Sequence, residues 1–244
     1  MNAKLKTTLT QLRLGGLARQ LELRLNEARM HNLDPAEFLE LLLHDEVIAR
    51  QHRSIERNTK SAGFRNLHTL DSFDFGFNTS IKRTEIYELA TGHFTQKAEN
   101  VLFIGPPGVG KSHLAQAIGS QLIRSGKTVL YRSIFDIVTE FASITPDKHL
   151  KTIQQYLKCD LLIIDDMGIK QLPTHSGEIL FEIIMRRYEL KSTLMTSNRP
   201  VEEWGKLIGD VPTATAILDR FLHNARIIPF KGISHRTNKG SKAD

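Results

Sequence analysis

Apolar and polar positions alternate with a helical period in the first part of the chain. The leucines of this stripe recur about every 3.6 residues or a multiple of it, namely Leu5, Leu9, Leu12, Leu21 and Leu25. That period predicts an amphipathic helical region. Gly15 and Gly16 interrupt the stripe, so we expect a break or a bend between two helices there.

A second helix is marked by its start signals. Asp34 is a suitable N-cap, Pro35 fits the first helical position, and Glu37 completes a capping box. Its predicted apolar face consists of Phe38, Leu41, Leu42, Val47 and Ile48. The helix is expected to run into the basic segment 50–57, and the polar residues 58–63 then predict a boundary.

From residue 100 onward, short apolar runs alternate with helical patterns. The predicted strands are 101–104, 128–132, 161–165, 192–197 and 226–230. The predicted helices between them are 111–124, 134–142, 148–157, 176–190 and 213–223. Apolar strands separated by helices predict an α/β fold with a parallel sheet that is buried on both faces.

Three phenylalanines precede this region at alternate positions, Phe73, Phe75 and Phe77. Alternation predicts an extended segment that packs on a core. The same side chains could instead line the site of a nucleotide base, just before the phosphate-binding motif. We expect packing for at least one of them and leave the base contact open.

The strongest chemical signal follows the first predicted strand. Residues 105–112 read GPPGVGKS, which matches the phosphate-binding loop pattern between a strand and a helix. Glycines let successive backbone N–H groups turn toward phosphates, Lys111 is expected to reach the β- and γ-phosphates, and the Ser112 hydroxyl to bind Mg²⁺. The predicted nucleotide-binding set is Gly105, Pro106, Pro107, Gly108, Val109, Gly110, Lys111, Ser112 and the adjoining His113. The chain is therefore predicted to bind a nucleoside triphosphate.

Polar residues end or follow two further predicted strands. Asp165 comes after four apolar residues and is expected to hold Mg²⁺ through water. Asp166 is next, where it either polarises the attacking water or caps the junction of strand and loop. Asn198 follows the strand 192–197 and is either a γ-phosphate sensor or the start of a turn.

Three arginines are candidates for a further catalytic role. Arg220 lies before the last predicted strand, and an arginine delivered across a subunit interface would stabilise charge at a neighbour's γ-phosphate. Arg186 and Arg187 end the preceding predicted helix and compete for this role. They fit equally well as contacts to DNA phosphate or as a helix C-terminal cap.

The amino-acid composition excludes several classes of protein. The 244 residues are 40% hydrophobic and 25% charged, which is ordinary for a globular protein. The single cysteine, Cys159, excludes a disulfide framework and a cysteine-based zinc site, and the ten histidines show no paired metal-binding spacing. No apolar run approaches the ~20 residues of a membrane span, and the basic N-terminal residues lack the apolar stretch of a signal peptide. We therefore expect a cytoplasmic protein without a membrane partner.

The net charge of the chain indicates that one expected partner is a polyanion. Thirty-three Lys and Arg against 27 Asp and Glu give a formal charge of +6, which favours a partner such as nucleic acid. One basic concentration runs from Arg50 to Arg65 and another lies after Phe230, and each fits either a solvated surface or phosphate contacts. The predicted DNA contacts are Arg50, Arg53, Arg57 and Lys60, with Arg186 and Arg187 as further candidates.

The motifs together resemble a known family. GPPGVGKSHLAQAIG at 105–119, LLIIDDMG at 161–168, TSNRP at 196–200 and ILDRFLH at 217–223 are similar, in this order, to AAA+ ATPases related to the DnaC helicase loader. Within that group the chain resembles the IstB-like helper ATPases of insertion sequences. LRLGGLARQL at 12–21 and SAGFRNLHTLDSFDF at 61–75 extend this resemblance over nearly the whole chain.

The resemblance implies a fold and a division into domains. It implies a small all-helical N-terminal domain followed by an α/β AAA+ P-loop domain with a central parallel sheet. The implied ranges are 1–60 for the helical domain, 61–99 for a linker into the core, 100–230 for the ATPase domain and 231–244 for a basic, disordered tail. Only 46 residues follow Asn198, so a full helical lid does not fit. Nucleotide closure must then use a neighbouring subunit or the N-terminal domain.

The resemblance also implies an activity and partners. ATP and Mg²⁺ would bind with Lys111, Ser112, Asp165, Asp166 and Asn198 in the roles above, and Arg220 would complete a neighbour's site. The expected function is an ATPase that assembles with further copies in a ring or helix on double-stranded DNA, largely without sequence preference. It would mark target DNA and recruit or activate a cognate transposase, with hydrolysis controlling assembly and release.

Two other functions compete with this expectation. A replicative helicase loader of the DnaC type would grip a helicase ring and bind single-stranded DNA. A small-molecule P-loop kinase would need an acceptor pocket and a lid that carries arginines, and the sequence shows neither signature.

Overall fold

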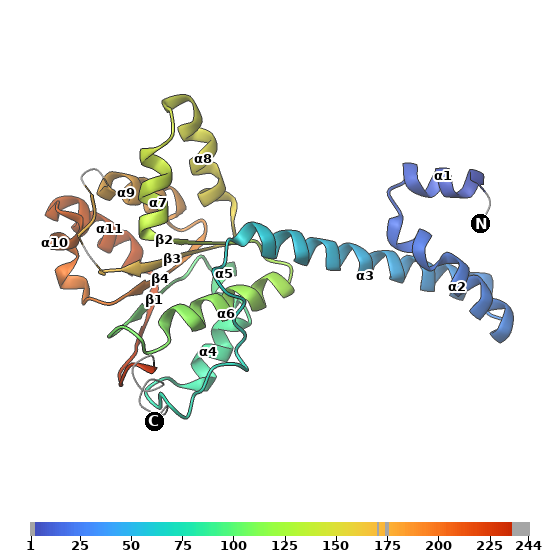
Figure 1. Ribbon diagram of the computed structural model, residues 1–244, viewed down its shortest axis with the longest axis horizontal. Helices are drawn as coiled ribbons and strands as arrows, with labels where there is room; N and C mark the ends of the chain where they lie inside the picture. Colours follow the sequence, from blue (N-terminus) through green and yellow to red (C-terminus); the bar gives the residue numbers. More distant parts are fainter. Residues whose placement is uncertain (1–2, 170, 174–175, 236–244) are drawn as a thin grey trace, which may run out of the picture. The chain divides into compact units, whose positions relative to one another are not determined.

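The computed structural model describes residues 3–169, 171–173 and 176–235 (Figure 1). The chain forms two compact units, Met1–Arg57 and Asn58–Asp244, and each is described by itself. In the described part of the chain, none of the helices has the length and hydropathy of a membrane span.

The first unit is helical, as predicted. It contains α1 (Ala3–Gln11), α2 (Gly15–His31) and most of α3 (Pro35–Ala62). The expected break at the two glycines is confirmed, because α2 begins at Gly15. The core is small and consists of Leu9, Leu17, Leu21 and Leu42, with Leu14, Ala18, Leu25 and Phe38 packed against it.

The start of α3 confirms the predicted capping box. The Asp34 amide donates to Glu37 Oε2 at 3.2 Å, and the Ala36 amide donates to Asp34 Oδ1 at 3.4 Å. The end of α3 differs from the expectation, because the helix continues through the polar segment 58–63 as far as Ala62. That segment contains no proline, and the helix ends only at Gly63, whose φ is +76°.

Glu46 of α3 is buried and joins α3 to the start of α2. Its Oε2 accepts the amides of Gly16 at 2.6 Å and Leu17 at 3.0 Å, two N–H groups that have no partner inside α2. Its Oε1 pairs with Arg50 at 2.8 Å and Arg53 at 3.0 Å. Burial raises the pKa of Glu46, but the hydrogen bonds outweigh this effect and the pKa falls to about 2.

The second unit is built on a five-stranded parallel sheet. Its strands are β1 (Asn100–Ile104), β2 (Val129–Ser133), β3 (Leu161–Met167), β4 (Ser192–Ser197) and β5 (Ala225–Pro229). They pair in the order β2-β3-β4-β1-β5, and all four pairings are parallel. The predicted strands and the predicted α/β fold are confirmed.

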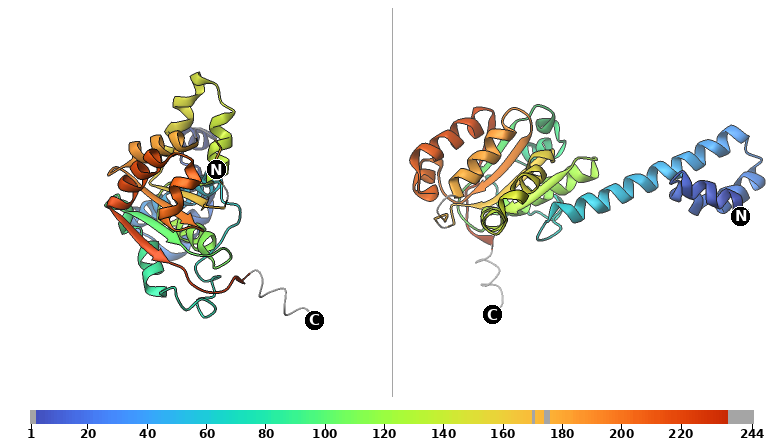
Figure 2. Two further views of the ribbon diagram at one scale, coloured as in Figure 1. Left: turned by 90° about the vertical axis from the view of Figure 1, so that its left-hand side faces the viewer. Right: turned by 90° about the horizontal axis from the view of Figure 1, so that it is seen from above.

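Helices cover both faces of this sheet (Figures 1 and 2). The face that contains Ile163 is covered by α6 (Lys111–Arg124), with α4 (Arg83–Ala90) beside it and α5 (His93–Gln96) just before β1. The other face packs its apolar residues against α7 (Ile134–Ala142), α8 (Pro146–Lys158), α9 (Ser176–Arg187), α10 (Trp204–Ile208) and α11 (Val211–His223). Between β4 and α10, the short 3-10 turn η1 spans Val201–Glu203. The parallel arrangement places the carboxyl ends of the strands at one edge.

Helices α4, α5 and α10 were not predicted, and two further segments differ from the prediction. Residues 73–77 form turns instead of an extended segment, because Asp74 Oδ1 accepts the amides of Gly76 at 2.9 Å and Phe77 at 3.1 Å. The segment 231–235, expected to be a disordered tail, is held in place: the Lys231 amide donates to Ser80 Oγ and the His235 amide donates to Gly108 O, both at 3.0 Å. The rest of the predicted tail, 236–244, lies outside the described residues.

Candidate nucleotide-binding and hydrolysis site

The GPPGVGKS motif forms the loop between β1 and α6. Gly108 and Gly110 have φ values of +81° and +102°, a region that other residues rarely adopt. A Cβ atom on Gly110 would also lie 2.4 Å from the ring of Phe73. The amides in the first turn of α6, which begins at Lys111, have no carbonyl partner within the helix. This is the geometry of an anion-binding helix N-terminus.

Lys111 brings the loop and the neighbouring strand together. Its side chain is buried, and Nζ donates to the carbonyls of Gly105 and Pro106 and to Asn198 Oδ1, each at 2.7 Å. Asn198 follows β4, and its amide donates to Met167 O of β3 at 2.9 Å. Asn198, the predicted γ-phosphate sensor, is therefore hydrogen-bonded to Lys111, the predicted phosphate-binding lysine.

Asp165 of β3 is surrounded by hydroxyl groups. Its Oδ1 accepts from Ser112 Oγ at 2.9 Å and from Thr196 Oγ1, and its Oδ2 accepts from Tyr131 Oη at 2.5 Å. Burial and the carboxylate raise the pKa of Tyr131, so this phenol remains a donor. A hydroxyl beside a carboxylate fits the oxygen ligands that Mg²⁺ prefers, so Ser112 and Asp165 would hold the ion that balances nucleotide phosphates.

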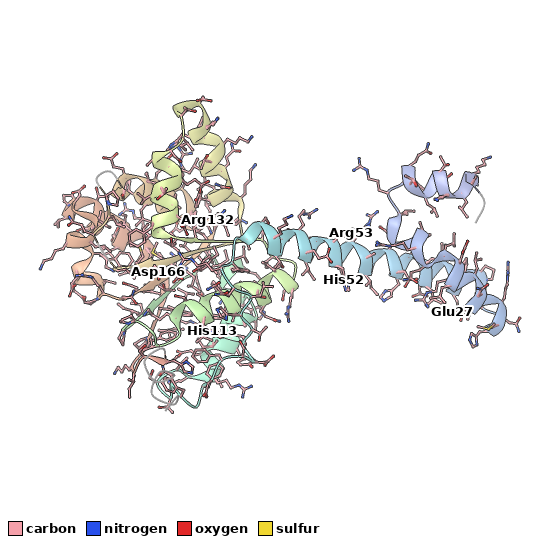
Figure 3. All side chains as sticks on the ribbon, in the orientation of Figure 1. Glu27, His52, Arg53, His113, Arg132 and Asp166 are labelled. Carbon is pink, nitrogen blue, oxygen red and sulfur yellow. The ribbon has the colours of Figure 1, made fainter. Side chains whose placement is uncertain are left out.

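Asp166 has an unusual backbone conformation. Its φ is +67°, and the pairing of β3 with β4 shifts register between Ile164 and Met167. Its amide donates to Thr196 Oγ1 at 3.2 Å, and its Oδ2 accepts from Arg65 Nη1 at 3.4 Å. Strained backbone of this kind clusters at functional sites. The side chain, labelled in Figure 3, is partly buried.

His113 binds the loop upstream of β1. Its ring stacks on His68 with centroids 4.0 Å apart, and its Nε2 lies 3.1 Å from Ser72 Oγ. Burial lowers the pKa of His113, and His68 adds to this effect. The ring of His113 is therefore engaged by this loop, and a contact of His113 to nucleotide stays a prediction.

The three phenylalanines of the same loop pack onto neighbouring side chains. Phe73 lies 4.8 Å from Phe75 and 5.4 Å from His113 between ring centroids, and Phe77 lies 4.7 Å from His235. The expectation that at least one of them packs is confirmed. A contact to a nucleotide base stays a prediction.

The three candidate arginines occupy different environments. Arg187 is 1% exposed and donates to the carbonyls of Tyr156 at 2.5 Å and Cys159 at 3.1 Å. It therefore fits neither DNA contact nor a role in a neighbour's site, and both predictions for Arg187 were wrong. Arg186 is half-exposed and pairs with Glu182 at 2.7 Å. Cys159 is also buried, which raises the pKa of its thiol.

Arg220 lies at the opposite end of β1 from the phosphate loop. Asn100, the first residue of β1, donates through Nδ2 to Phe221 O at 2.9 Å, whereas the loop follows Ile104. The strand separates these points by roughly 13 Å. Arg220 is therefore remote from the phosphate loop of its own chain and pairs with Asp219, and its role in a neighbour's site stays a prediction.

The basic residues of α3 divide into two kinds. Arg50 and Arg53, the latter labelled in Figure 3, share the carboxylate of Glu46. Arg57 and Lys60 are exposed and have no carboxylate partner among the described residues. The latter two are the stronger candidates for phosphate contact.

Several residues of the site were not predicted. Tyr131 and Thr196 hold Asp165 from β2 and β4, and Arg65 contacts Asp166 from the segment after α3. The pairing of β2, β3 and β4 could have suggested the first two, because polar residues within apolar strands meet across a sheet. Arg65 lies in the basic run that begins at Arg50, but no local pattern marks its contact to Asp166, since the contact joins residues 101 positions apart in the chain.

Comparison with known families agrees with this geometry. The family described as IstB-like ATP binding protein matches residues 7–243. An ATP-binding protein of insertion sequence IS5376 from Geobacillus stearothermophilus is 40% identical over 210 residues, which cover 86% of this chain and 84% of the relative. Its counterpart in insertion sequence IS21 from Pseudomonas aeruginosa is 34% identical and covers 98% and 91%.

Solved structures show the same fold at low identity. The DnaC helicase loader has a TM-score of 0.55 at 24% identity, covering 67% of this chain and 96% of that chain. AMPPCP-bound DnaA from Aquifex aeolicus has a TM-score of 0.56 at 22% identity, covering 74% and 56%. With the matched family spanning both units, the chain belongs to the IstB-like ATP-binding proteins of insertion sequences and has an AAA+ fold.

Proposed function

We propose that this protein is an ATP-dependent DNA-binding factor of insertion-sequence transposition. ATP binding assembles copies of the chain on double-stranded target DNA, and the assembly recruits or activates a cognate transposase. Hydrolysis then releases it. The observation that carries this proposal is the convergence of Lys111, Asn198, Ser112 and Asp165 in a member of a family of insertion-sequence ATP-binding proteins.

The site supports ATP hydrolysis, not binding alone. Lys111 and the amides of α6 would hold the phosphates, while Ser112 and Asp165 would hold Mg²⁺. Asp166, next to Asp165 in the chain, would then polarise the attacking water. Such catalysis consists mostly of positioning and electrostatic stabilisation.

DNA binding is supported by charge and not by a base-reading module. Arg57 and Lys60 lie on one side of α3, three residues apart. Arg186 supplies a further exposed guanidinium on the second unit. Contacts of this kind go to phosphates, so affinity should depend weakly on sequence and strongly on salt.

Light scattering after size-exclusion chromatography tests the proposal. The full chain is mixed with random-sequence duplex under ATP, ADP or no nucleotide, beside Lys111→Ala and a control, Lys97→Ala, at an exposed position far from the site. We expect a large complex only with ATP and duplex, present for the control and absent for Lys111→Ala. If neither nucleotide nor Lys111→Ala changed the affinity for duplex DNA, the proposed control of DNA binding by ATP would be refuted.

A helicase loader is the second candidate, because the DnaC loader shares the fold. Assembly on single strands only, together with capture of a replicative helicase, would favour it. Assembly on duplex, and capture of a cognate transposase, would favour the transposition factor.

A further inference from the structure

The end of helix α3 is fastened to strand β2. Arg132 Nη1 donates to Ala62 O at 3.3 Å and to Tyr131 O at 2.7 Å. Gly63 leaves room for this guanidinium, since a Cβ there would lie 2.2 Å from Arg132 Nη1. The last turn of α3 therefore has a fixed position on the edge strand of the sheet.

The next residue, Phe64, packs beside Tyr131, the tyrosine that donates to Asp165. The centroids of the Phe64 and Tyr131 rings lie 6.0 Å apart. The Phe64 ring also fills the space next to Gly119 of α6, where a Cβ would lie 2.9 Å from Phe64 Cζ. A displacement of α3 would thus move the Phe64 side chain, which packs on β2 and α6, and through Tyr131 it would also affect Asp165 of β3.

Arg65 follows and contacts the hydrolytic carboxylate itself. Its Nη1 lies 3.4 Å from Asp166 Oδ2, and its Nη2 lies 3.6 Å from Asp136 Oδ2. The side chain of Asp166 is 23% exposed, whereas that of Arg65 is 53% exposed. The guanidinium can therefore move into solvent, while the carboxylate is held by a strained backbone.

We propose that Arg65 is a positioning residue that restrains Asp166 and makes ATP hydrolysis depend on helix α3, which carries the N-terminal unit. This inference rests on the proposed function, because it assigns Asp166 to hydrolysis and DNA contacts to α3. Paired with Arg65, the carboxylate has one oxygen occupied and therefore fewer lone pairs for a water molecule. A partner or DNA that engages α3 shifts residues 63–65 and frees Asp166.

The step that Arg65 restrains is the attack of water. The water oxygen bonds to the γ-phosphorus while the bond to the β–γ bridging oxygen breaks, and ADP leaves with that electron pair. Asp166 accepts the proton of the water and passes it to the phosphate product. An Asp166 carboxylate that is held by Arg65 orients this water poorly.

ATP turnover of the full chain tests the inference. Arg65→Ala, Arg65→Lys and the control Arg226→Ala are compared with the wild type, with and without duplex DNA. Arg226 forms a 3.0 Å ion pair with Glu88, away from the site. We expect Arg65→Ala to raise DNA-free kcat by about 3–10-fold with KM changed less than about twofold. DNA should then stimulate this variant little, while Arg65→Lys and Arg226→Ala behave like the wild type.

Two further measurements separate the possible failures. Arg65→Ala combined with Asp166→Asn should show no gain, because the restrained carboxylate is gone. A wild type that binds no DNA would refute the proposed function, yet the DNA-free kcat of Arg65→Ala would still decide this inference. Should Arg65→Ala fail to fold, Arg65→Gln replaces it in the same comparison. Unchanged or lower DNA-free kcat in the folded variant overturns the inference.

Discussion

Asp165 and Asp166 are neighbours in sequence but have different surroundings. Asp165 accepts hydrogen bonds from hydroxyl groups of three other elements and is almost fully buried. Asp166 turns out of the strand through its left-handed backbone. The two carboxylates can therefore serve a metal ion and a water molecule separately.

Replacing each carboxylate should separate these two tasks. Asp166→Asn keeps the side-chain shape but removes the base, so kcat should fall by about 100-fold or more with KM nearly unchanged. Asp165→Asn should instead raise the Mg²⁺ concentration needed for half-maximal turnover. Steady-state kinetics over a Mg²⁺ titration measure both. Equal effects of the two variants on kcat and on Mg²⁺ dependence would contradict the division.

The backbone of the phosphate loop gives a second prediction at this scale. Gly110→Ala adds left-handed strain and a clash with Phe73, so ATP affinity should fall by at least about tenfold. Gly126 is a matched control, because its φ is +84° and a Cβ added there would meet no atom within 4 Å. Equilibrium binding of a fluorescent ATP analogue checks this. Comparable losses in Gly110→Ala and Gly126→Ala would contradict a specific role for the loop.

Among the elements, α2 and α3 depend on a single buried carboxylate. Glu46 binds the amino end of α2 and two arginines of its own helix, and its pKa of about 2 lies below its usual value of 4.5. Because the folded pKa is the lower one, the stabilisation is complete above about pH 4.5 and is lost as pH falls toward 2.

Glu46→Gln should therefore lower the free energy of unfolding of the N-terminal unit by about 1–3 kcal/mol at neutral pH. The loss should shrink as pH falls from 4.5 toward 2, where the wild-type carboxyl itself becomes protonated. Urea unfolding followed by circular dichroism measures it, with exposed Glu40→Gln on the same helix as the control. A pH-independent difference between Glu46→Gln and wild type would contradict this account.

Elements with a strong local pattern were predictable. The five strands and the five predicted helices after residue 100 agree with the apolar periods, because a sheet buried on both faces leaves uninterrupted apolar runs, whereas the short helix α10 was not predicted. The capping box at Asp34 is local as well. The turns at residues 73–77 were missed, because the Asp74 side chain overrode an alternating pattern.

The site was predictable where its chemistry lies in a continuous motif. Ser112 meets Asp165, and Lys111 contacts its own loop, since a strand and its following loop fix their positions. Arg187 illustrates the limit: its neighbour Arg186 is exposed, and only packing against Tyr156 and Cys159 decides which of the two is buried. Arg65 illustrates the same limit, because its contact depends on tertiary structure.

At the scale of the whole molecule, the proposed function predicts that a second copy completes the site. Arg220 lies at the far end of β1, and residues 230–235, the described residues beyond β5, contain no helical lid. A second copy would supply the missing guanidinium if subunits pack head to tail. Each site would then combine Lys111 of one chain with Arg220 of the next.

Mixing two inactive variants tests this arrangement. Lys111→Ala and Arg220→Ala should each lose turnover alone, and an equal mixture should regain about a quarter of the wild-type rate, since a quarter of the random neighbours restore both residues. Steady-state ATPase assays on DNA measure it. No recovery in the mixture, although the two variants co-assemble in light scattering, would contradict a shared site.

The burial of Cys159 has a practical consequence for following this protein in solution. It is the only cysteine in the sequence, it is 6% exposed, and its thiol has a raised pKa. Thiol-reactive dyes should therefore leave the native chain almost unlabelled. Ser234→Cys would place a single fluorophore beside Gly108 of the phosphate loop, so that nucleotide arrival and departure become a stopped-flow optical signal.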